Sequence, residues 1–409
     1  MRLERLIASR LLQRGKDSLS RPLVSVATWS IALATLVMVM AVSILRGFQH
    51  NIEQKVVGFG GHIVVKSQAV GRYYEEQPMV RHRSDLQRMA SARGVRHVQG
   101  VAQIGGMAKT DDQIQGIVLK GIGPDYDTAF LHACLLQGSI PAYLADTTLP
   151  PNNEVLASKT LCDRLGLSLG DKMRTYFWEG DTYRARAFVI AGIYSTDLPE
   201  LDERFVVGDL RHVQRLNGWH ADQVASLEVA IDDMGHIAPI AERLYKALGY
   251  DLTLTTIVED NPALFAWLDL LNSNIALILS VMAVVCMAAI VSALLIMLFE
   301  KTSMIGMLKT LGATNGSIRK IFVLKTLSLA ARGIAMGSAA ALAMSLAQSR
   351  WHIVRLNSEN YSMSHVPVEL GAGIYLSIAA GTLAVCLVAM LLPAAHIAKI
   401  EPAKTIRFE

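Results

Sequence analysis

The chain has 409 residues, of which 52% are hydrophobic and 18% are charged, and its formal net charge is +4. The charged fraction is too large for a protein that lies inside a membrane along its whole length. The small net charge, with cations gathered at the ends of apolar runs, excludes a nucleic-acid-binding protein, which needs a concentrated basic patch. The composition therefore predicts a protein with both membrane and aqueous parts.

The first 46 residues predict a membrane-surface helix followed by a membrane span. Residues 1–21 place apolar side chains on one helical face and arginines elsewhere, which is typical of an interfacial helix on the cytosolic side. Residues 22–46 form the first predicted span, because this run is apolar and uncharged up to Arg46. The alternative is a cleaved signal peptide, whose apolar core is shorter, about 7–15 residues.

Residues 47–268 alternate β-rich runs with amphipathic helical runs and predict a folded α/β domain. Strands are predicted at HIVVKS, GVAQIGGMAKT and QIQGIVLKGI, and helices at SDLQRMASARG and SKTLCDRLGLSLGD. A β-hairpin is predicted from Lys172 to Ile190, with its turn at Glu179-Gly180-Asp181. We expect two subdomains, of which a β-rich one at about 121–221 is inserted into the other.

Three further apolar runs complete a predicted set of four transmembrane helices. They are 269–299, 319–348 and 371–396, separated by a cytosolic segment at 300–318 and a periplasmic loop at 349–370, and followed by a cytosolic tail at 397–409. Lysine and arginine flank the first span on its N-terminal side, lie between the second and third spans, and follow the fourth. Because positive charge is retained in the cytosol, both termini are predicted to be cytosolic. The predicted fold class is an α-helical membrane domain with a large α+β periplasmic domain between helices 1 and 2.

The third predicted span contains an unusual charge and a small-residue motif. Arg332 lies well inside the apolar run, and it either snorkels or pairs within the protein, or faces a polar cavity. The adjoining Gly333 and Gly337 have the GxxxG spacing that lets two helix backbones approach closely, so we expect packing against a neighbouring span. In the exported region, Cys134 and Cys162 either form a disulfide or remain free, since spacing does not establish proximity.

Two enzyme motifs are absent from the sequence, since it contains no GxxxxGK[S/T] phosphate loop and no HExxH. Histidines such as His50, His62 and His82 show neither i,i+4 pairing nor nearby cysteines, so no metal site is predicted. We therefore expect a non-catalytic chain that binds no cofactor itself.

The segment EKTSMIGMLKTLGATNGSIRKIF, which begins at Glu300, predicts a tight helical corner. Gly312 can take the left-handed conformation that ends a helix, and Thr314 suits the N-cap of the next one. On charge alone, an ordinary basic cytosolic loop is the alternative. The segment resembles E(R/K)xxxIGxLKxLGA, the coupling segment of FtsX/MacB/LolC-type permeases, which docks onto a separate ATPase in that family. The resemblance assigns ATPase coupling to Glu300, Lys301, Ile305, Gly306, Leu308, Lys309, Leu311, Gly312 and Ala313.

Three other segments resemble LolC/LolE-type lipoprotein-releasing permeases, so that the resemblance covers nearly the whole chain. They are SILRGFQHNIEQKVVGFGGHIVV, similar to SVMNGFxxxLxxKILGxxxHI; SENYSMSHVPVEL, before the fourth span; and PAAHIAKIEPAKTIRFE, similar to the PAxxAxxxxPxEALRYE tail. The resemblance implies an ABC transporter permease that extracts lipoproteins from the inner membrane and passes them to a periplasmic carrier for outer-membrane sorting. The implied partners are two copies of an ATPase that binds ATP and Mg, a second permease, identical or homologous, the lipoprotein cargo and membrane lipid.

The same resemblance implies two binding surfaces. Ile44, Leu45 and Phe48 correspond to residues that line the lipoprotein cavity, with ordinary lipid-facing side chains as the alternative; Arg46 departs from the asparagine that is common in the family. The hairpin at 172–190 corresponds to a hook for the carrier, but it is shorter than in LolC-type subunits and lacks proline. Its residues Tyr176, Phe177 and Trp178 either form a carrier or partner surface or pack into a core.

Two other functions stay open. The first is a MacB/FtsX-like mechanotransmission permease for efflux or envelope remodelling, which would not depend on acylated cargo. The second is a membrane sensor with an exported ligand-binding domain, although the predicted cytosolic segments are short for a signalling protein.

Overall fold

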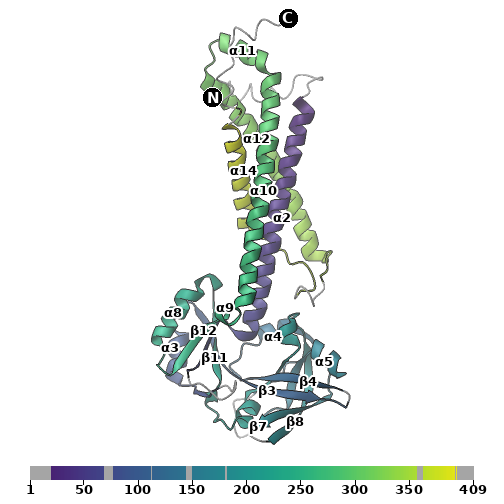
Figure 1. The fold of residues 1–409 in the computed structure, drawn as a ribbon, viewed down its shortest axis with the longest axis vertical. Coiled ribbons are helices and arrows are strands. Elements are labelled where there is room, and N and C mark those ends of the chain that lie inside the picture. Colours follow the sequence, from purple (N-terminus) through teal and green to yellow (C-terminus); the bar gives the residue numbers. More distant parts are fainter. Residues whose placement is uncertain are drawn as a thin grey trace. The chain divides into compact units, whose positions relative to one another are not determined.

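The structure is a computed structural model that describes residues 20–68, 77–111, 113–143, 150–179, 182–356, 363–391 and 393. The predicted interfacial helix before residue 20 and the predicted tail at 397–409 lie outside these residues. The chain divides into two compact units (Figure 1). A helical unit comprises residues 1–49, 267–355 and 365–409, and an α+β unit comprises residues 50–266 and 356–364.

The helical unit contains the membrane spans. Within the described residues, four helices are long and apolar enough to cross a bilayer: α2 (Ser20–Gly60), α10 (Pro262–Glu300), α12 (Asn315–Trp351) and α14 (Ala372–Ala389). A short helix, α11 (Thr302–Thr310), lies between α10 and α12. The predicted fold class, with four transmembrane helices and a large α+β domain after the first, is confirmed. Helix α2 supplies residues to both units, since residues 50–60 belong to the α+β unit.

The GxxxG face of α12 packs against α2, as the sequence predicted. A Cβ atom on Gly337 would lie 2.3 Å from the Ala32 carbonyl oxygen, and one on Gly333 would lie 2.8 Å from the Ile31 side chain. Only glycine allows this approach of two helix backbones. Arg332, the residue before this face, is exposed on α12.

In the part of the α+β unit that the structure describes, the main element is one ten-stranded mixed sheet. Its strands are β1 (Ile63–Ser67), β3 (Val95–Lys109), β4 (Ile114–Ile122), β5 (Leu135–Gly138), β6 (Glu154–Ser158), β7 (Lys172–Glu179), β8 (Thr182–Tyr194), β9 (Phe205–Asp209), β11 (Ser226–Ile231) and β12 (Leu252–Thr256). The strand order is β12-β1-β11-β3-β4-β9-β6-β8-β5, and β7 pairs with both β3 and β8. A separate pair consists of β2 (Met79–Val80) and β10 (Gln223–Val224).

Short helices surround the sheet. They are α3 (Arg83–Ala90), α4 (Ala129–Cys134), α5 (Lys159–Leu165), α6 (Pro199–Asp202), α7 (Leu210–Leu216), α8 (Ile237–Ala247) and α9 (Ile257–Asp260), with a 3-10 turn η1 (Met234–His236). The strands from 121–221 lie together at the β5 end of the sheet, but they continue the same sheet as the others. The boundaries of an inserted subdomain therefore remain a prediction.

The two cysteines of the exported region are free thiols. Cys134 is half-buried and Cys162 is buried in the core. Burial raises the pKa of each thiol to about 11, so both are protonated at neutral pH. The disulfide alternative is thus not realised.

Candidate coupling helix and associated sites

Helix α11 ends in a fixed corner formed by Gly312 and Ala313. Gly312 has φ +92, and its N–H donates to the Lys309 carbonyl at 3.1 Å. The Ala313 N–H donates to the Leu308 carbonyl at 2.9 Å. These two bonds define a Schellman motif, which satisfies carbonyls that a helix end otherwise leaves unpaired. The predicted left-handed stop at Gly312 is confirmed.

Helix α12 begins at once after this corner. Thr314 is its N-cap, with φ −77 and ψ 154, and the Thr314 hydroxyl accepts a bond from the Ser317 N–H at 3.3 Å. The predicted cap is therefore confirmed as well. Gly312 and Ala313 link the two helices, and a capping motif stabilises the helix end on each side of them. The corner between α11 and α12 therefore resists bending.

One side of α11 is buried and the other presents apolar side chains. Ile305 and Gly306 are buried, and Ile305 belongs to the same core cluster as Ile31 and Ile290 of the long helices. On the outer side, Met307 is 60% exposed and Leu311 is 79% exposed. A load applied to this outer side is passed through Ile305 to the core of the helical unit, because closely packed interiors transmit displacement.

The charged residues of the predicted coupling segment and of the start of α12 are mainly basic. Glu300 and Lys301 form an ion pair at 3.3 Å. Lys309 is half-buried, whereas Arg319 and Lys320 at the start of α12 are exposed. The segment and the start of α12 thus carry mainly basic side chains in addition to the two exposed apolar ones.

The predicted cavity residues at the outer end of span one are partly covered within the chain. Leu45 is buried, Ile44 is half-buried, and the Phe48 ring contacts Trp267 edge-on with 5.5 Å between ring centroids. Gly47 is required between them, since a Cβ there would lie 2.9 Å from the Pro367 carbonyl oxygen. The assignment of these residues to a lipoprotein cavity stays a prediction.

The three aromatic residues of the predicted partner surface lie on strand β7, and one of them, Phe177, is not on the surface. Phe177 is fully buried, because β7 is hydrogen-bonded on both sides and its alternate side chains enter the core. Tyr176 is half-buried. Trp178 is 54% exposed, and its ring contacts Tyr183 of β8, itself 57% exposed, with 4.7 Å between centroids. Sequence reasoning missed Tyr183, which only the hairpin register brings opposite Trp178.

A buried ion pair in the sheet was also missed. The Lys120 ammonium group on β4 lies 2.7 Å from the Glu228 carboxylate on β11, and both side chains are buried. Burial alone lowers the pKa of Lys120, but Glu228 and Tyr126 outweigh it and hold the pKa above its ordinary value. Lys120 is therefore an ammonium ion inside the domain. No periodic pattern marks it, since its neighbours in β4 are buried too.

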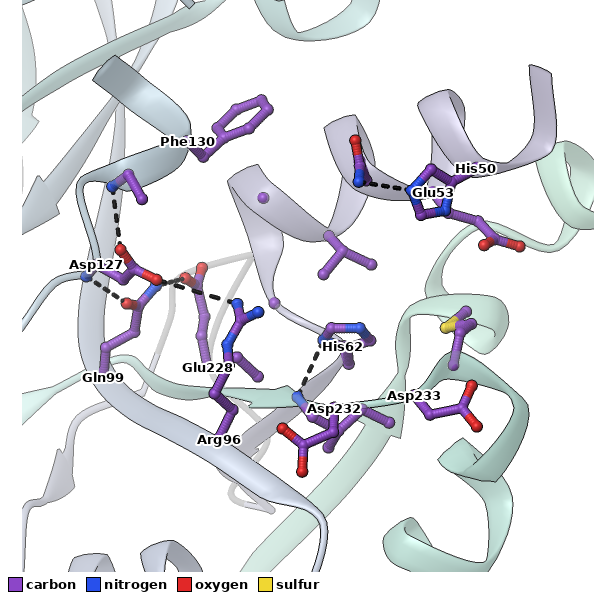
Figure 2. A pocket seen from close by; sticks show the side chains of 18 residues that line it. His50, Glu53, His62, Arg96, Gln99, Asp127, Phe130, Glu228, Asp232 and Asp233 are labelled. Atoms are coloured by element: carbon purple, nitrogen blue, oxygen red, sulfur yellow. Dashed lines mark hydrogen bonds and ion pairs between the residues drawn. The ribbon is translucent and has the colours of Figure 1, made fainter. Parts of the chain in front are cut away.

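Beside this pair lies a polar cavity of about 440 Å³, whose labelled lining residues Figure 2 shows. It is bounded by His50 and Glu53 of α2, by Arg96 of β3 and by Asp232 after β11. The His62 ring accepts a bond from the Ile231 N–H at 3.2 Å, and burial together with Arg96 lowers the pKa of His62 to about 4. Among the described residues, no group of three or more His, Cys, Asp or Glu side chains is arranged to hold a metal ion.

These features define the class of protein: a four-span membrane permease with a large α+β domain inserted after its first span. Residues 25–247, more than half of the chain, match the MacB-like periplasmic core domain, and residues 276–402 match the FtsX-like permease C-terminal region. The chain belongs to the FtsX/MacB-like permease family.

Three named relatives are similar to nearly the whole chain. The lipoprotein-releasing system transmembrane protein LolC of Xylella fastidiosa is 22% identical, covering 93% of this chain and 92% of the relative. LolC of Neisseria meningitidis serogroup B is 22% identical, with 95% and 94% covered, and LolE of Haemophilus influenzae is 21% identical, with 96% and 97% covered. The LolC/LolE-type resemblance is thereby confirmed.

Among solved structures, the periplasmic region of MacB from Actinobacillus actinomycetemcomitans is 15% identical. It covers 51% of this chain and 95% of that one, with a TM-score of 0.35. The similarity is too weak to carry an argument.

Proposed function

We propose that this chain is the permease subunit of an ABC transporter that extracts lipoproteins from the inner membrane and passes them to a periplasmic carrier, driven by a separate ATPase. The similarity to proteins named for lipoprotein release, over more than nine-tenths of their length, supports the cargo. The observation that carries the coupling role is α11, which is capped at its C-terminal end and exposes Met307 and Leu311.

The ATPase is proposed to dock on the outer side of α11. Met307 and Leu311 would enter an apolar groove of the ATPase, and the basic side chains of the segment would meet acidic side chains of the ATPase. Two ATPase copies would bind ATP and Mg, and a second permease, identical or homologous, would provide the other docking helix. The flanking cations support an orientation with α11 and both termini in the cytosol and the α+β unit in the periplasm.

Lipid extraction needs such an energy source. Each acyl CH₂ transferred from a bilayer to water costs about 0.8 kcal/mol, so three chains of about 15 such groups would cost roughly 36 kcal/mol. The chains therefore need an apolar cavity along the whole route. We propose that Ile44, Leu45 and Phe48 contribute to its wall, and that the exposed ring pair of Trp178 and Tyr183 contributes to the carrier surface.

Reconstitution tests this function. Full-length chain, its ATPase and a triacylated lipoprotein are placed in proteoliposomes, and released lipoprotein is measured with soluble carrier outside. We expect release that requires ATP and the acyl chains. Release that does not depend on acylation, or none at all with ATP being hydrolysed, would favour the second candidate, a mechanotransmission permease for efflux or envelope remodelling, which the MacB-like core domain also supports.

A further inference from the structure

Lys120 holds the last turn of helix α2 as well as its ion-pair partner. Its ammonium group donates to the Phe59 carbonyl and to Glu228 at 2.7 Å, and it lies 4.6 Å from the centroid of the Phe59 ring. The Phe59 carbonyl belongs to the end of α2, where helix carbonyls lack partners within the helix and carry the negative end of the helix dipole. A buried cation is therefore directed at the C-terminus of the first span.

The same cation connects α2 to three neighbouring strands. Lys120 comes from β4 and Glu228 from β11. The second Glu228 oxygen accepts a bond from the side-chain Nε2 of Gln99 on β3 at 2.9 Å, and the side-chain Oε1 of Gln99 accepts one from the Asp127 N–H at 2.9 Å (Figure 2). Since β11, β3 and β4 are adjacent in the sheet, a displacement of the α2 end acts on the centre of the sheet.

Further contacts of residues 50–60 fit the same arrangement. The Phe59 ring contacts Phe205 edge-on with 4.9 Å between centroids, and a Cβ on Gly58 would lie 2.3 Å from the Phe130 ring. Lys55 forms an ion pair with Asp197 at 3.2 Å. The contacts of Phe59 and Lys55 are made by side chains of the helix, whereas the bond from Lys120 is made to a backbone carbonyl of its last turn.

We infer that Lys120 is a positioning residue for transport, which ties the exported end of span one to the sheet and so passes movement of α2 into the α+β unit. This inference rests on the proposed function for its consequence in transport. The tie itself is a property of the α+β unit and can be measured without any cargo.

The test uses the full-length double variant Lys120→Met with Glu228→Gln. Removing only Lys120 would leave a buried unpaired carboxylate. Removing both charges leaves the net charge of the domain unchanged, and replacing a whole buried ion pair by uncharged groups is often tolerated. One control, Lys246→Met with Glu242→Gln, removes an exposed ion pair on α8. A second control, Leu244→Ala, shortens a buried core side chain on α8 and reports general loss of stability.

The first measurement is amide hydrogen exchange of the full chain in detergent micelles. We expect exchange of the last turns of α2, residues 52–60, to rise about tenfold to a hundredfold in the double variant, the effect of losing one bond to a charged donor. Exchange in β4 and β11 should stay as in wild type. Unchanged exchange in α2, or an equal rise across the whole sheet, would overturn the inference.

The second measurement is the reconstituted assay, in which ATP hydrolysis and lipoprotein release are followed together. We expect the double variant to hydrolyse ATP within about twofold of wild type while releasing at least about tenfold less cargo per ATP. If the double variant released as much cargo per ATP as a control of the same melting temperature, the role of Lys120 in transport would be overturned. A wild-type protein that releases no lipoprotein would refute the proposed function instead, and the exchange experiment would still decide whether Lys120 ties α2 to the sheet.

Discussion

Replacing Gly337 by alanine should destabilise the helical unit, although alanine is the better helix former. The added Cβ would lie 2.3 Å from the Ala32 carbonyl oxygen and 2.9 Å from the Thr35 Cβ, so α2 itself must move. Overpacking of this kind costs about 1–3 kcal/mol. The gain in helix propensity is about 1 kcal/mol. The expected net effect is therefore a loss of up to about 2 kcal/mol.

Gly381 on α14 provides the matched control, because nothing lies within 4 Å of a Cβ placed there. Gly381→Ala makes the same change of propensity without the clash, so the difference between the two variants isolates the helix contact. Unfolding of each full-length variant by SDS in mixed micelles should place Gly337→Ala about 1–3 kcal/mol below Gly381→Ala. A Gly337→Ala protein as stable as Gly381→Ala would refute the close α2–α12 contact.

Three other perturbations have expected outcomes. An insertion after Gly312, or charge reversal at Lys309, should uncouple ATP hydrolysis from release in the reconstituted assay; unchanged coupling would count against docking on α11. Lys120→Met alone should lower unfolding free energy by about 3–5 kcal/mol, since Glu228 is left buried and unpaired, while the double variant should recover most of it. Because the pKa of His62 is lowered from 6.5 to about 4, its contribution to stability is complete above pH 6.5 and is lost as the pH falls toward 4, by at most about 1.4 kcal/mol per pH unit. In thermal melts, His62→Asn should reduce the slope of stability against pH. A smaller slope should remain from His212, because burial also lowers the pKa of His212. A slope in the variant equal to that of the wild type would exclude His62 as its source.

Features set by local chemistry could be predicted from the sequence. The spans follow from long apolar runs, of which the third carries charged residues such as Arg332. The corner after α11 follows from Gly312 and Thr314, whose backbone preferences act within a few residues. The close packing of α12 against a neighbouring span follows from Gly333 and Gly337, because small residues four apart leave a helix face bare, but only the structure shows that this span is α2.

Features set by the sheet could not be predicted in this way. Phe177 and Trp178 are adjacent aromatic residues, and only the pairing of β7 with β3 and β8 decides which one enters the core. Lys120 and Glu228 are separated by 108 residues and meet because β11, β3 and β4 are neighbours. A lysine in a strand is usually exposed, so neither its burial nor its contact with Phe59 has a local signal.

Docking of the ATPase on α11 is the central claim, and its most direct test is the affinity of the purified ATPase for the full-length permease in lipid nanodiscs. Leu311→Gln changes the exposed apolar residue that caps the C-terminal end of α11, and Leu136→Gln changes an exposed leucine of the α+β unit. Loss of an apolar anchor typically costs about 1–2 kcal/mol or more, so we expect Leu311→Gln to weaken binding about fivefold to thirtyfold or more while Leu136→Gln has no effect. Equal affinity of the ATPase for the wild type and Leu311→Gln would contradict docking at this helix.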